Sequence, residues 1–364
     1  MQKEILLLLS LFIWSCQKSV DFETEKKKIQ AQIDLVDRAH ESKDAIQFYQ
    51  PNTESWYDVR QGTVTLVKKS DMINSTQSYL DKMVIQEMTK RDDPIIEISD
   101  DGTLASYIGS VTVKGILAGT PLYWVVSWQS VLKKINGEWK IISSANTEAD
   151  KRTSAIVLLN QIRENLGSPT DNTSIYAYAQ CKAPERSFQT LVLSSKTDGR
   201  LEQIYDKRHF ILKHGIGSSW TYDLNTKSLK EDMDISVKES IYGHELHWLS
   251  FWPEHRYLDP VLLSITEFMN QTAFNIEFKD GMSRSINFYY SFDTYIPLGY
   301  ESQLDDKGGK VSVHFEDWEK IEGISFFKRA ILHHGDEIFE YDFVDIKMNQ
   351  LDSQDFENKI GLIN

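Results

Sequence analysis

Histidines are the residues of this chain whose grouping could most directly support chemistry. Eight of the nine follow residue 200, and two of them stand in the run His244-Glu245-Leu246-His247. Imidazole is a common zinc ligand, so His244, His247 and His255 are the candidates for a metal site. The spacing is not the His-Glu-x-x-His of metalloproteases, and on a strand two residues three apart point to opposite faces. We therefore expect structural histidines and predict no bound metal.

Asp58 and Arg60 are the candidate acid–base residues of the first part of the chain. They stand next to Trp56 at the end of a predicted strand, where the Asp58 carboxylate could reach the mouth of a pocket. His40 is the third candidate, on or beside the buried stripe of a predicted helix. An Asp58–Arg60 ion pair facing water is the alternative that we favour. The sequence therefore predicts no catalytic set.

Aromatic side chains are the candidate ligand-binding residues. They are Trp56, Tyr107, Trp124, Trp128, Trp248 and Trp252. Alternation along 122–134 places Trp124 and Trp128 on one strand face, where they either line a cavity or fill the core. Trp248 and Trp252 lie in the apolar stretch 247–253, which is either a lid over a cavity or a plug that fills it.

Cofactor motifs are absent from the sequence. It contains no phosphate-binding loop, dinucleotide fingerprint, nucleophile elbow or Cys-x-x-Cys pair, so we predict no cofactor. The only cysteines are Cys16 and Cys181. We expect Cys181 to be a buried structural thiol, and a reactive thiol is the alternative.

The N-terminus carries an export pattern. Lys3 precedes an apolar run of about ten residues, half the length that a membrane-spanning helix needs. The run ends in Ile13-Trp14-Ser15-Cys16, which resembles the bacterial lipobox. The resemblance implies a signal peptide over 1–16, a lipid anchor on Cys16, a tether over 17–22, and a place in the bacterial envelope, at the outer membrane. A cleaved signal with an unmodified cysteine is the alternative.

Composition limits the remaining possibilities. The 364 residues are 41% hydrophobic, which is ample for packed cores and suggests two domains. The net charge of −14 argues against nucleic acid as a partner, because phosphate binding requires concentrated Lys and Arg. It also argues against electrostatic adhesion to anionic lipid, so we expect membrane contact through the anchor alone. The sequence leaves the oligomeric state open.

The first domain, predicted over 23–150, alternates helices with strands. Helices are predicted over 23–43, 44–49 and 70–88, and strands over 55–59, 63–67, 95–98, 104–113, 122–134 and 138–146. Asn136-Gly137 predicts the hairpin that joins the last two strands. This order, with the turn Lys134-Ile135-Asn136-Gly137-Glu138-Trp139, resembles the NTF2-like (SnoaL-like) fold. The resemblance implies a curved sheet around a helix-lidded conical pocket.

The second domain is predicted over 175–357, after a helical join at 151–174 and before a tail at 358–364. Its short alternating strands predict an antiparallel meander with an irregular middle between about 230 and 260. The segments Pro297-Leu298-Gly299, 314–318 and 341–349 resemble the open barrel of LolA/LolB-like lipoprotein-sorting proteins. The resemblance implies a half-barrel with an apolar concave face suited to a lipid.

These features predict an α+β protein with an NTF2-like cone followed by a mostly antiparallel open half-barrel. The function that they favour is a non-catalytic, membrane-anchored binding lipoprotein that holds an apolar small molecule or lipid. Two alternatives stay open. One is an isomerase- or hydratase-like enzyme with its site in the first pocket, and the other is a scaffold for an envelope complex.

Overall fold

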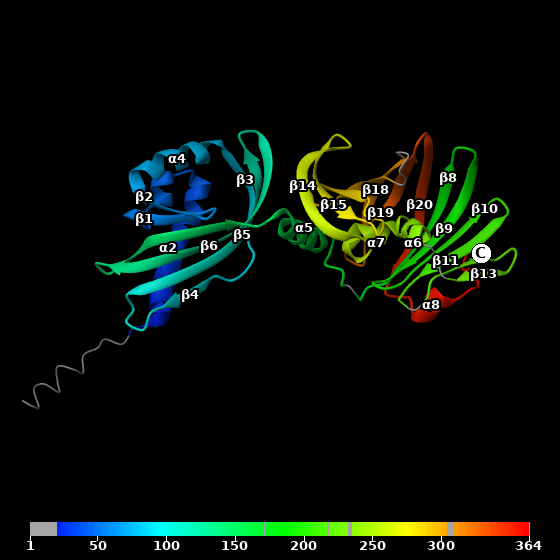
Figure 1. Cartoon of the computed structure of the whole chain (residues 1–364), viewed down its shortest axis with the longest axis horizontal. Helices are drawn as coiled ribbons and strands as arrows, with labels where there is room; N and C mark the ends of the chain where they lie inside the picture. The colour runs from blue at the N-terminus through cyan, green and yellow to red at the C-terminus, as the bar shows by residue number, and fades with distance from the viewer. Residues whose placement is uncertain (1–19, 171, 217, 232–234, 304–308, 364) are drawn as a thin grey trace, which may run out of the picture. The chain divides into compact units, whose positions relative to one another are not determined.

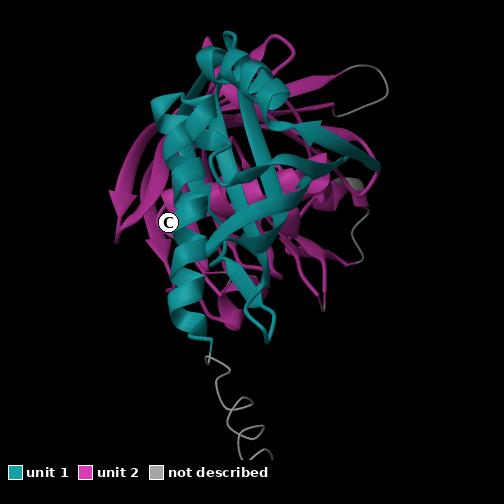
Figure 2. Ribbon diagram, turned by 90° about the vertical axis from the view of Figure 1, so that its left-hand side faces the viewer, with its two compact units in different colours: residues 1–149 teal, residues 150–364 magenta. Residues whose placement is uncertain are grey.

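The structure is a computed structural model that describes residues 20–170, 172–216, 218–231, 235–303 and 309–363 (Figure 1). The predicted lipidation site, Cys16, lies outside the described residues. The chain forms two compact units, residues 1–149 (unit 1) and residues 150–364 (unit 2) (Figure 2). Across the described residues, every helix is too short or too polar to cross a bilayer.

Unit 1 is a curved sheet with helices. Its described helices are α2 (Phe22–Ser42), α3 (Ala45–Phe48) and α4 (Lys69–Lys82). Its strands are β1 (Asn52–Arg60), β2 (Thr63–Lys68), β3 (Met83–Lys90), β4 (Ile95–Ile98), β5 (Leu104–Leu117), β6 (Thr120–Ile135) and β7 (Glu138–Glu148). The strand order is β2-β1-β7-β6-β5-β3, with β4 also paired to β5. All pairs are antiparallel except β1 with β7, which is parallel.

The predicted helix over 70–88 is wrong for its last residues, 83–88. The helix ends at Lys82, and residues 83–90 form β3, which pairs with β5 from Met83 opposite Leu117. The β-branched side chains of Val84 and Ile85 suit a pleated strand. Residues 83–90 form a strand because they pair with β5, which lies far away in the sequence. Helical periodicity is a local pattern and cannot indicate such pairing.

The core of unit 1 forms where α2 packs against the sheet. Asp21 caps the helix by accepting a hydrogen bond from the Thr24 amide at 3.1 Å. Ile29 and Ile33, one turn apart, are buried against Trp139 and other residues of β5–β7. The predicted apolar stripe of this helix is therefore confirmed.

A buried carboxylate joins α2 to the β6–β7 hairpin. Glu25 accepts a hydrogen bond from Trp139 Nε1 at 2.7 Å and forms ion pairs with Lys134 at 2.7 Å and Lys28 at 2.8 Å. Lys134, then Lys28, outweigh the cost of burial and lower the pKa of Glu25 to about 2. The contact connects the first described helix to the last hairpin of the unit.

We predict that Glu25→Gln lowers the stability of unit 1 by about 2–3 kcal/mol at neutral pH. The folded pKa lies below the unfolded value, so the carboxylate stabilises the unit above pH 4.5 and loses its effect as the pH falls toward 2. The difference between wild type and variant should therefore shrink over that interval, as measured by hydrogen exchange of α2 amides. Glu23→Gln, at an exposed position of the same helix, is the matched control. A pH-independent difference would contradict the prediction.

Unit 2 is built on one large sheet. Its strands are β8 (Ile175–Ala183), β9 (Arg186–Ser194), β10 (Gly199–Tyr205), β11 (Arg208–His214), β12 (Trp220–Asp223), β13 (Ser228–Glu231), β14 (Leu258–Phe268), β15 (Gln271–Lys279), β16 (Ser285–Ser291), β17 (Pro297–Gln303), β18 (Lys310–Ile321), β19 (Ile324–His334) and β20 (Glu337–Met348). The 13 strands follow the order β13-β12-β11-β10-β9-β8-β20-β19-β18-β17-β16-β15-β14. The predicted antiparallel meander is confirmed.

Four α-helices accompany this sheet in the described part of unit 2. They are α5 (Lys151–Asn165), α6 (Ile235–Tyr242), α7 (Leu246–Phe251) and α8 (Ser353–Glu357), with a 3-10 turn at Pro253–His255. Figure 1 shows α6 and α7 within the curve of the sheet. Helices α6 and α7 and the 3-10 turn occupy the segment between β13 and β14, which was predicted to be irregular.

The α7 helix fills part of the sheet face. All six of its residues are buried. The His247 ring stacks on Phe327 of β19 with centroids 4.0 Å apart, and its Nε2 donates to the Phe327 carbonyl at 3.0 Å. Of the two interpretations of the stretch 247–253, the structure thus supports a plug at α7. A cavity remains beside it, under α6.

Candidate functional site

Unit 1 encloses a cavity of about 240 Å³ between α2, α3 and the concave face of the sheet. Its walls are largely aromatic, with Phe48 and Tyr49 on the helical side and Trp56 and Trp128 on the sheet side. Tyr49 and Trp56 pack with ring centroids 5.2 Å apart. The size and the aromatic lining suit a small organic molecule.

Trp128 can line this cavity because a glycine lies opposite it. Gly109 of β5 pairs with Trp128 of β6, and a Cβ atom at Gly109 would lie 2.8 Å from the indole ring. Behind the indole lies Tyr107, whose ring stacks on it at 6.1 Å. The missing side chain therefore lets the indole lie against the sheet and leaves room above it.

The charged groups at this cavity are paired. Arg60 Nε bonds Asp58 at 2.8 Å, and Ser144 Oγ donates to the other oxygen of Asp58 at 3.2 Å. Asp37, which also lines the cavity, pairs with Lys90 at 3.1 Å. The ion pairs leave the cavity close to electrical neutrality, which favours an uncharged ligand.

His40 supplies a neutral polar group to the same cavity. Its Nδ1 bonds the Val36 carbonyl at 3.0 Å, one helical turn earlier. Burial lowers its pKa, because the charged imidazolium would lose hydration. Nδ1 therefore carries the proton, and Nε2 is a hydrogen-bond acceptor. A ligand hydroxyl or amide is a suitable donor for it.

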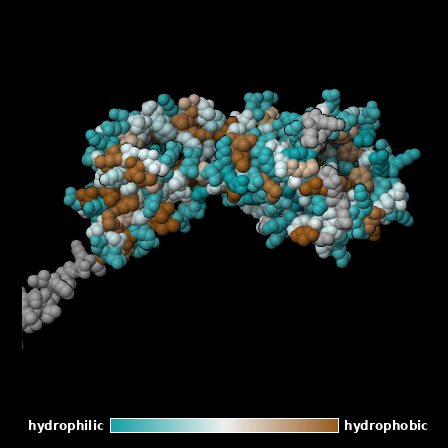
Figure 3. Space-filling view, viewed as in Figure 1, coloured by the Kyte–Doolittle hydropathy of each residue, from teal (hydrophilic) through white to brown (hydrophobic). Residues whose placement is uncertain are grey.

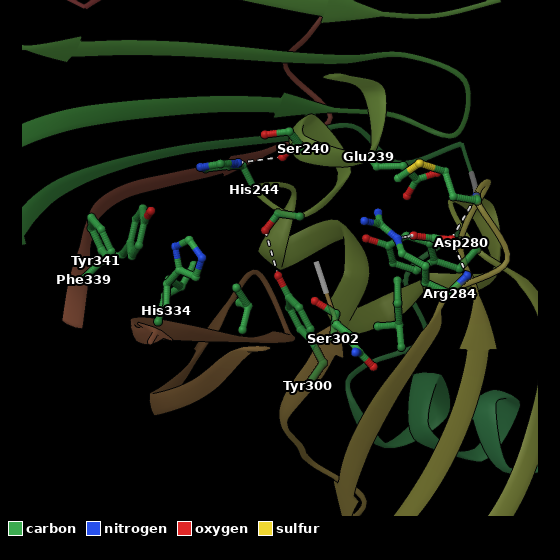
Figure 4. Close-up of a pocket in the computed structure, with 17 residues that line it drawn as sticks. Glu239, Ser240, His244, Asp280, Arg284, Tyr300, Ser302, His334, Phe339 and Tyr341 are labelled. Atoms are coloured by element: carbon green, nitrogen blue, oxygen red, sulfur yellow. Dashed lines mark hydrogen bonds and ion pairs between the residues drawn. The ribbon is translucent and has the colours of Figure 1, made fainter. Parts of the chain in front are cut away.

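Unit 2 encloses a second cavity of about 420 Å³, under α6 (Figure 4). Glu239, Asp280 and Arg284 lie on one side of it, and Phe339 and Tyr341 lie on the other (Figure 4). This cavity therefore has one polar and one largely apolar side.

A buried ion cluster beside this cavity holds α7 in place. The Glu245 carboxylate bonds Arg256 at 2.7 and 2.9 Å and His214 at 2.9 Å. Burial alone would raise the pKa of Glu245, but the charges of Arg256 and His214 outweigh it and lower the pKa to about 2. All three side chains are buried, so we assign the cluster a structural role.

Four predicted residues of unit 1 meet at its cavity. Trp56, Trp128, Arg60 and His40 all line it. Asp58 does not; it binds Arg60 and Ser144, so the predicted ion pair forms and positions Arg60.

Two further aromatic candidates of unit 1 lie beside the cavity lining. Tyr107 lies behind Trp128, and Trp124 stacks on Tyr79 at 6.4 Å, outside the lining. Trp124 and Trp128 share a strand face, as predicted, but only Trp128 reaches the cavity.

The aromatic candidates of unit 2 lie in the packed interior. Trp248 and Trp252 are buried against each other with centroids 4.5 Å apart, and the lining of the unit 2 cavity includes neither. His255 stacks on Trp252. Both indole rings are packed in the interior and not at the unit 2 cavity, which corrects the prediction that they bind a ligand there.

The histidine run does not converge. His244 Nδ1 bonds the Ser240 carbonyl at 2.7 Å, whereas His247 bonds a carbonyl of β19. Within the described ranges, no group of three His, Cys, Asp or Glu side chains could hold a metal ion.

Cys181 lies on β8 with its side chain buried. Desolvation raises the pKa of its thiol to about 12, so the thiolate is scarce at neutral pH. Both observations support the structural interpretation of this cysteine.

Several cavity residues were not predicted from the sequence. Asp37 and Ser144 have partners that come from other elements, and Glu239 lies in the stretch predicted to be irregular. A signal was present only for Asp37, which lies one turn from Ile33 and three residues before His40 on the same helix.

Unit 1 also exposes apolar side chains on its strands. Figure 3 shows several hydrophobic patches on this unit. Exposed cross-strand pairs include Tyr57 with Leu66 and Ile95 with Ile108. An exposed apolar surface is the feature that the scaffold alternative requires.

The described fold is of the mixed α+β class, mostly sheet, with two open sheets that each enclose a cavity beneath helices. No family model and no curated protein matches the sequence.

Similar solved structures fall into two groups. A domain from Vibrio parahaemolyticus assigned to outer membrane lipoprotein sorting is 16% identical, covers 56% of this chain and 97% of its own, and has a TM-score of 0.43. A LolA superfamily protein from Nitrosomonas europaea is 14% identical, with 56% and 96% covered and a TM-score of 0.41. An NTF2-like protein from Cytophaga hutchinsonii is 18% identical, with 34% and 98% covered and a TM-score of 0.29.

Proposed function

We propose that the chain is a non-catalytic binding lipoprotein of the bacterial envelope, anchored through Cys16, whose unit 1 cavity holds a small, uncharged, largely apolar molecule. The observation that carries the proposal is the aromatic cavity with paired charges at its edge. Stacking on Trp56 and Trp128 would supply most of the affinity, and the neutral His40 would supply a directional hydrogen bond.

Binding is favoured over catalysis because the carboxylates at the unit 1 cavity are held in ion pairs. The Asp58 carboxylate is held by Arg60 and Ser144 and lies outside the cavity lining. Asp37 is paired with Lys90. The enzyme alternative would require one of these pairs to open when the substrate binds.

We predict that Trp128→Ala weakens binding of an uncharged aromatic probe, 2-naphthol, at least tenfold. The variant removes the stacking surface and part of the buried apolar area, and tenfold corresponds to about 1.4 kcal/mol. Binding should be measured by titration calorimetry on the full chain, with 2-naphthoate as the charged counterpart. We expect naphthoate to bind more weakly, because the cavity has no unpaired cation for it.

Trp124→Ala is the matched control for this experiment. Trp124 lies on the same strand face but stacks on Tyr79 outside the cavity lining, so its loss should leave naphthol binding nearly unchanged. Equal losses in the two variants, or no binding of naphthol to the wild type, would count against the proposal.

The anchor requires a separate test. Intact-mass measurement of protein extracted from bacterial membranes should show an acylated N-terminal cysteine and no residues before Cys16. Cys16→Ser should release the chain from the membrane fraction, because acyl chains supply the membrane affinity. A retained leader or an unmodified thiol would overturn the anchored part of the proposal.

A further inference from the structure

The polar side of the unit 2 cavity contains one carboxylate that is already neutralised. Asp280 is buried and bonds Arg284 Nε at 2.6 Å. The same carboxylate accepts the backbone amides of Met282 at 2.9 Å and Arg284 at 2.8 Å. Asp280 and Arg284 therefore form an ion pair within the turn that follows β15.

Glu239 is the second carboxylate on this side, and it is not neutralised. It projects from α6, and one of its oxygens accepts the Gly281 amide at 2.8 Å. Among the residues that the structure describes, it forms no ion pair. Burial raises its pKa, because the ionised form loses hydration, and this outweighs the Gly281 amide and the charge of Arg284, which lower the pKa. The polar side therefore carries two carboxylates and one guanidinium, and the ionised groups leave it with a net negative charge.

The rest of the cavity offers a surface for an apolar chain. Ile286 of β16, Val311 of β18, Leu332 of β19 and Phe339 of β20 line it, so apolar side chains from four strands face one space. A volume of about 420 Å³ exceeds what a small head group alone would fill. The lining thus combines an acidic end with an apolar channel, and His244, His334 and Gln303 add polar groups beside them. An acidic end next to an apolar channel matches the division of an amphiphile.

We propose that the unit 2 cavity binds a single-chain amphiphile with a cationic amine head group, which pairs with Glu239 while the alkyl chain lies against Ile286, Val311 and Leu332. An ammonium group would provide the missing counter-charge and hydrogen-bond donors. An anionic head group would face an uncompensated carboxylate. The site lies in a different unit from the naphthol cavity, so either proposal can fail while the other holds.

The test uses four dodecyl probes on the full chain, each below its micelle concentration. They are dodecylamine, dodecanol, dodecyl sulfate and lyso-phosphatidylethanolamine with a twelve-carbon chain, and binding is measured by titration calorimetry at pH 7. We expect dodecylamine to bind at least tenfold more tightly than dodecanol, and dodecyl sulfate to bind most weakly. Comparing the affinities for the lyso-lipid and for dodecylamine shows whether the site prefers the cation as part of a lipid head group or as a free amine. Equal affinity for dodecylamine and dodecyl sulfate would overturn the proposal.

Glu239→Gln isolates the charge. The amide keeps the shape and the acceptor for the Gly281 amide, so the variant should fold, as checked by its thermal unfolding. We expect at least a tenfold loss for dodecylamine and no change for dodecanol. Glu319→Gln, on β18 and outside the cavity lining, is the matched control and should affect neither.

Leu332→Asn, in the apolar channel, should weaken dodecylamine and dodecanol alike. If Glu239→Gln bound both dodecylamine and dodecanol more weakly, or bound dodecylamine as tightly as the wild type does, the role of the carboxylate would be contradicted.

Discussion

Glu245→Ala should lower the free energy of unfolding of unit 2 by about 3–5 kcal/mol. The side chain is 0% exposed and is the acceptor for both Arg256 and His214. Removing it leaves the buried Arg256 guanidinium without its counter-charge, because its other bonds go to the carbonyls of Ser195 and Lys196. An unpaired buried charge costs far more than a lost surface pair does.

The measurement is urea unfolding followed by tryptophan fluorescence, because Trp248 lies under the Arg256 guanidinium and reports on this region. Glu319→Ala is the control, since Glu319 pairs with Lys328 at 3.2 Å on a half-exposed surface and should cost less than about 1 kcal/mol. Similar losses in the free energy of unfolding for both variants would show that the buried cluster stabilises unit 2 no more than a surface ion pair does.

Glu202→Ala should release the C-terminal segment and destabilise unit 2 by a similar amount, about 3–5 kcal/mol. Glu202 and Arg200 are both 0% exposed and pair at 3.0 Å, and His209 bonds the same carboxylate at 2.8 Å. The carboxylate also accepts the backbone amides of Leu362 and Ile363 at 2.9 to 3.0 Å. One side chain therefore pairs a buried cation and holds the end of the chain.

The C-terminal segment covers apolar surface as well. Phe356 and Ile363 pack on Leu191 and Leu193 of β9, and Ile363 belongs to the region predicted as a tail, 358–364. Hydrogen exchange should show that the amides of Leu362 and Ile363 lose protection in Glu202→Ala. Full protection in the variant would mean that apolar packing alone holds the segment.

A truncation after residue 357 separates the two contributions of Glu202. It removes the Leu362 and Ile363 contacts while leaving Arg200 and Glu202 paired. We expect a smaller loss of stability than in Glu202→Ala, because the buried guanidinium keeps its counter-charge. An equal or larger loss would assign most of the effect to the segment and little to the ion pair.

Local patterns in the sequence correctly predicted several elements. The apolar stripe of α2 and the alternation along β6 are confirmed, with Val126, Trp128 and Ser130 on the cavity face. Asn136 and Gly137 have φ values of 52° and 84°, as expected for the turn of a tight hairpin. These features depend on residues that are neighbours in the chain, so their periodicity and turn chemistry are visible in the sequence.

Pairing between distant segments could not be predicted in the same way. The parallel pairing of β1 with β7 and the antiparallel pairing of β20 with β8 join segments far apart in the sequence. The conversion of residues 83–90 from predicted helix to β3 has the same origin. Each pairing is one of many that local sequence permits, and the choice depends on which arrangement buries the most surface for the whole chain.

The candidate sites divide in the same way. The sequence by itself determined which residues carry aromatic rings and charges, and it placed Trp124 and Trp128 on one strand face without deciding between a cavity and the core. Only the tertiary structure decided that Trp248 and Trp252 are packed away, that Asp58 is paired, and that Glu239 lines a cavity without an ion pair to any described residue. A side chain's availability depends on the partners and solvent around it, and the fold brings those partners from distant parts of the chain.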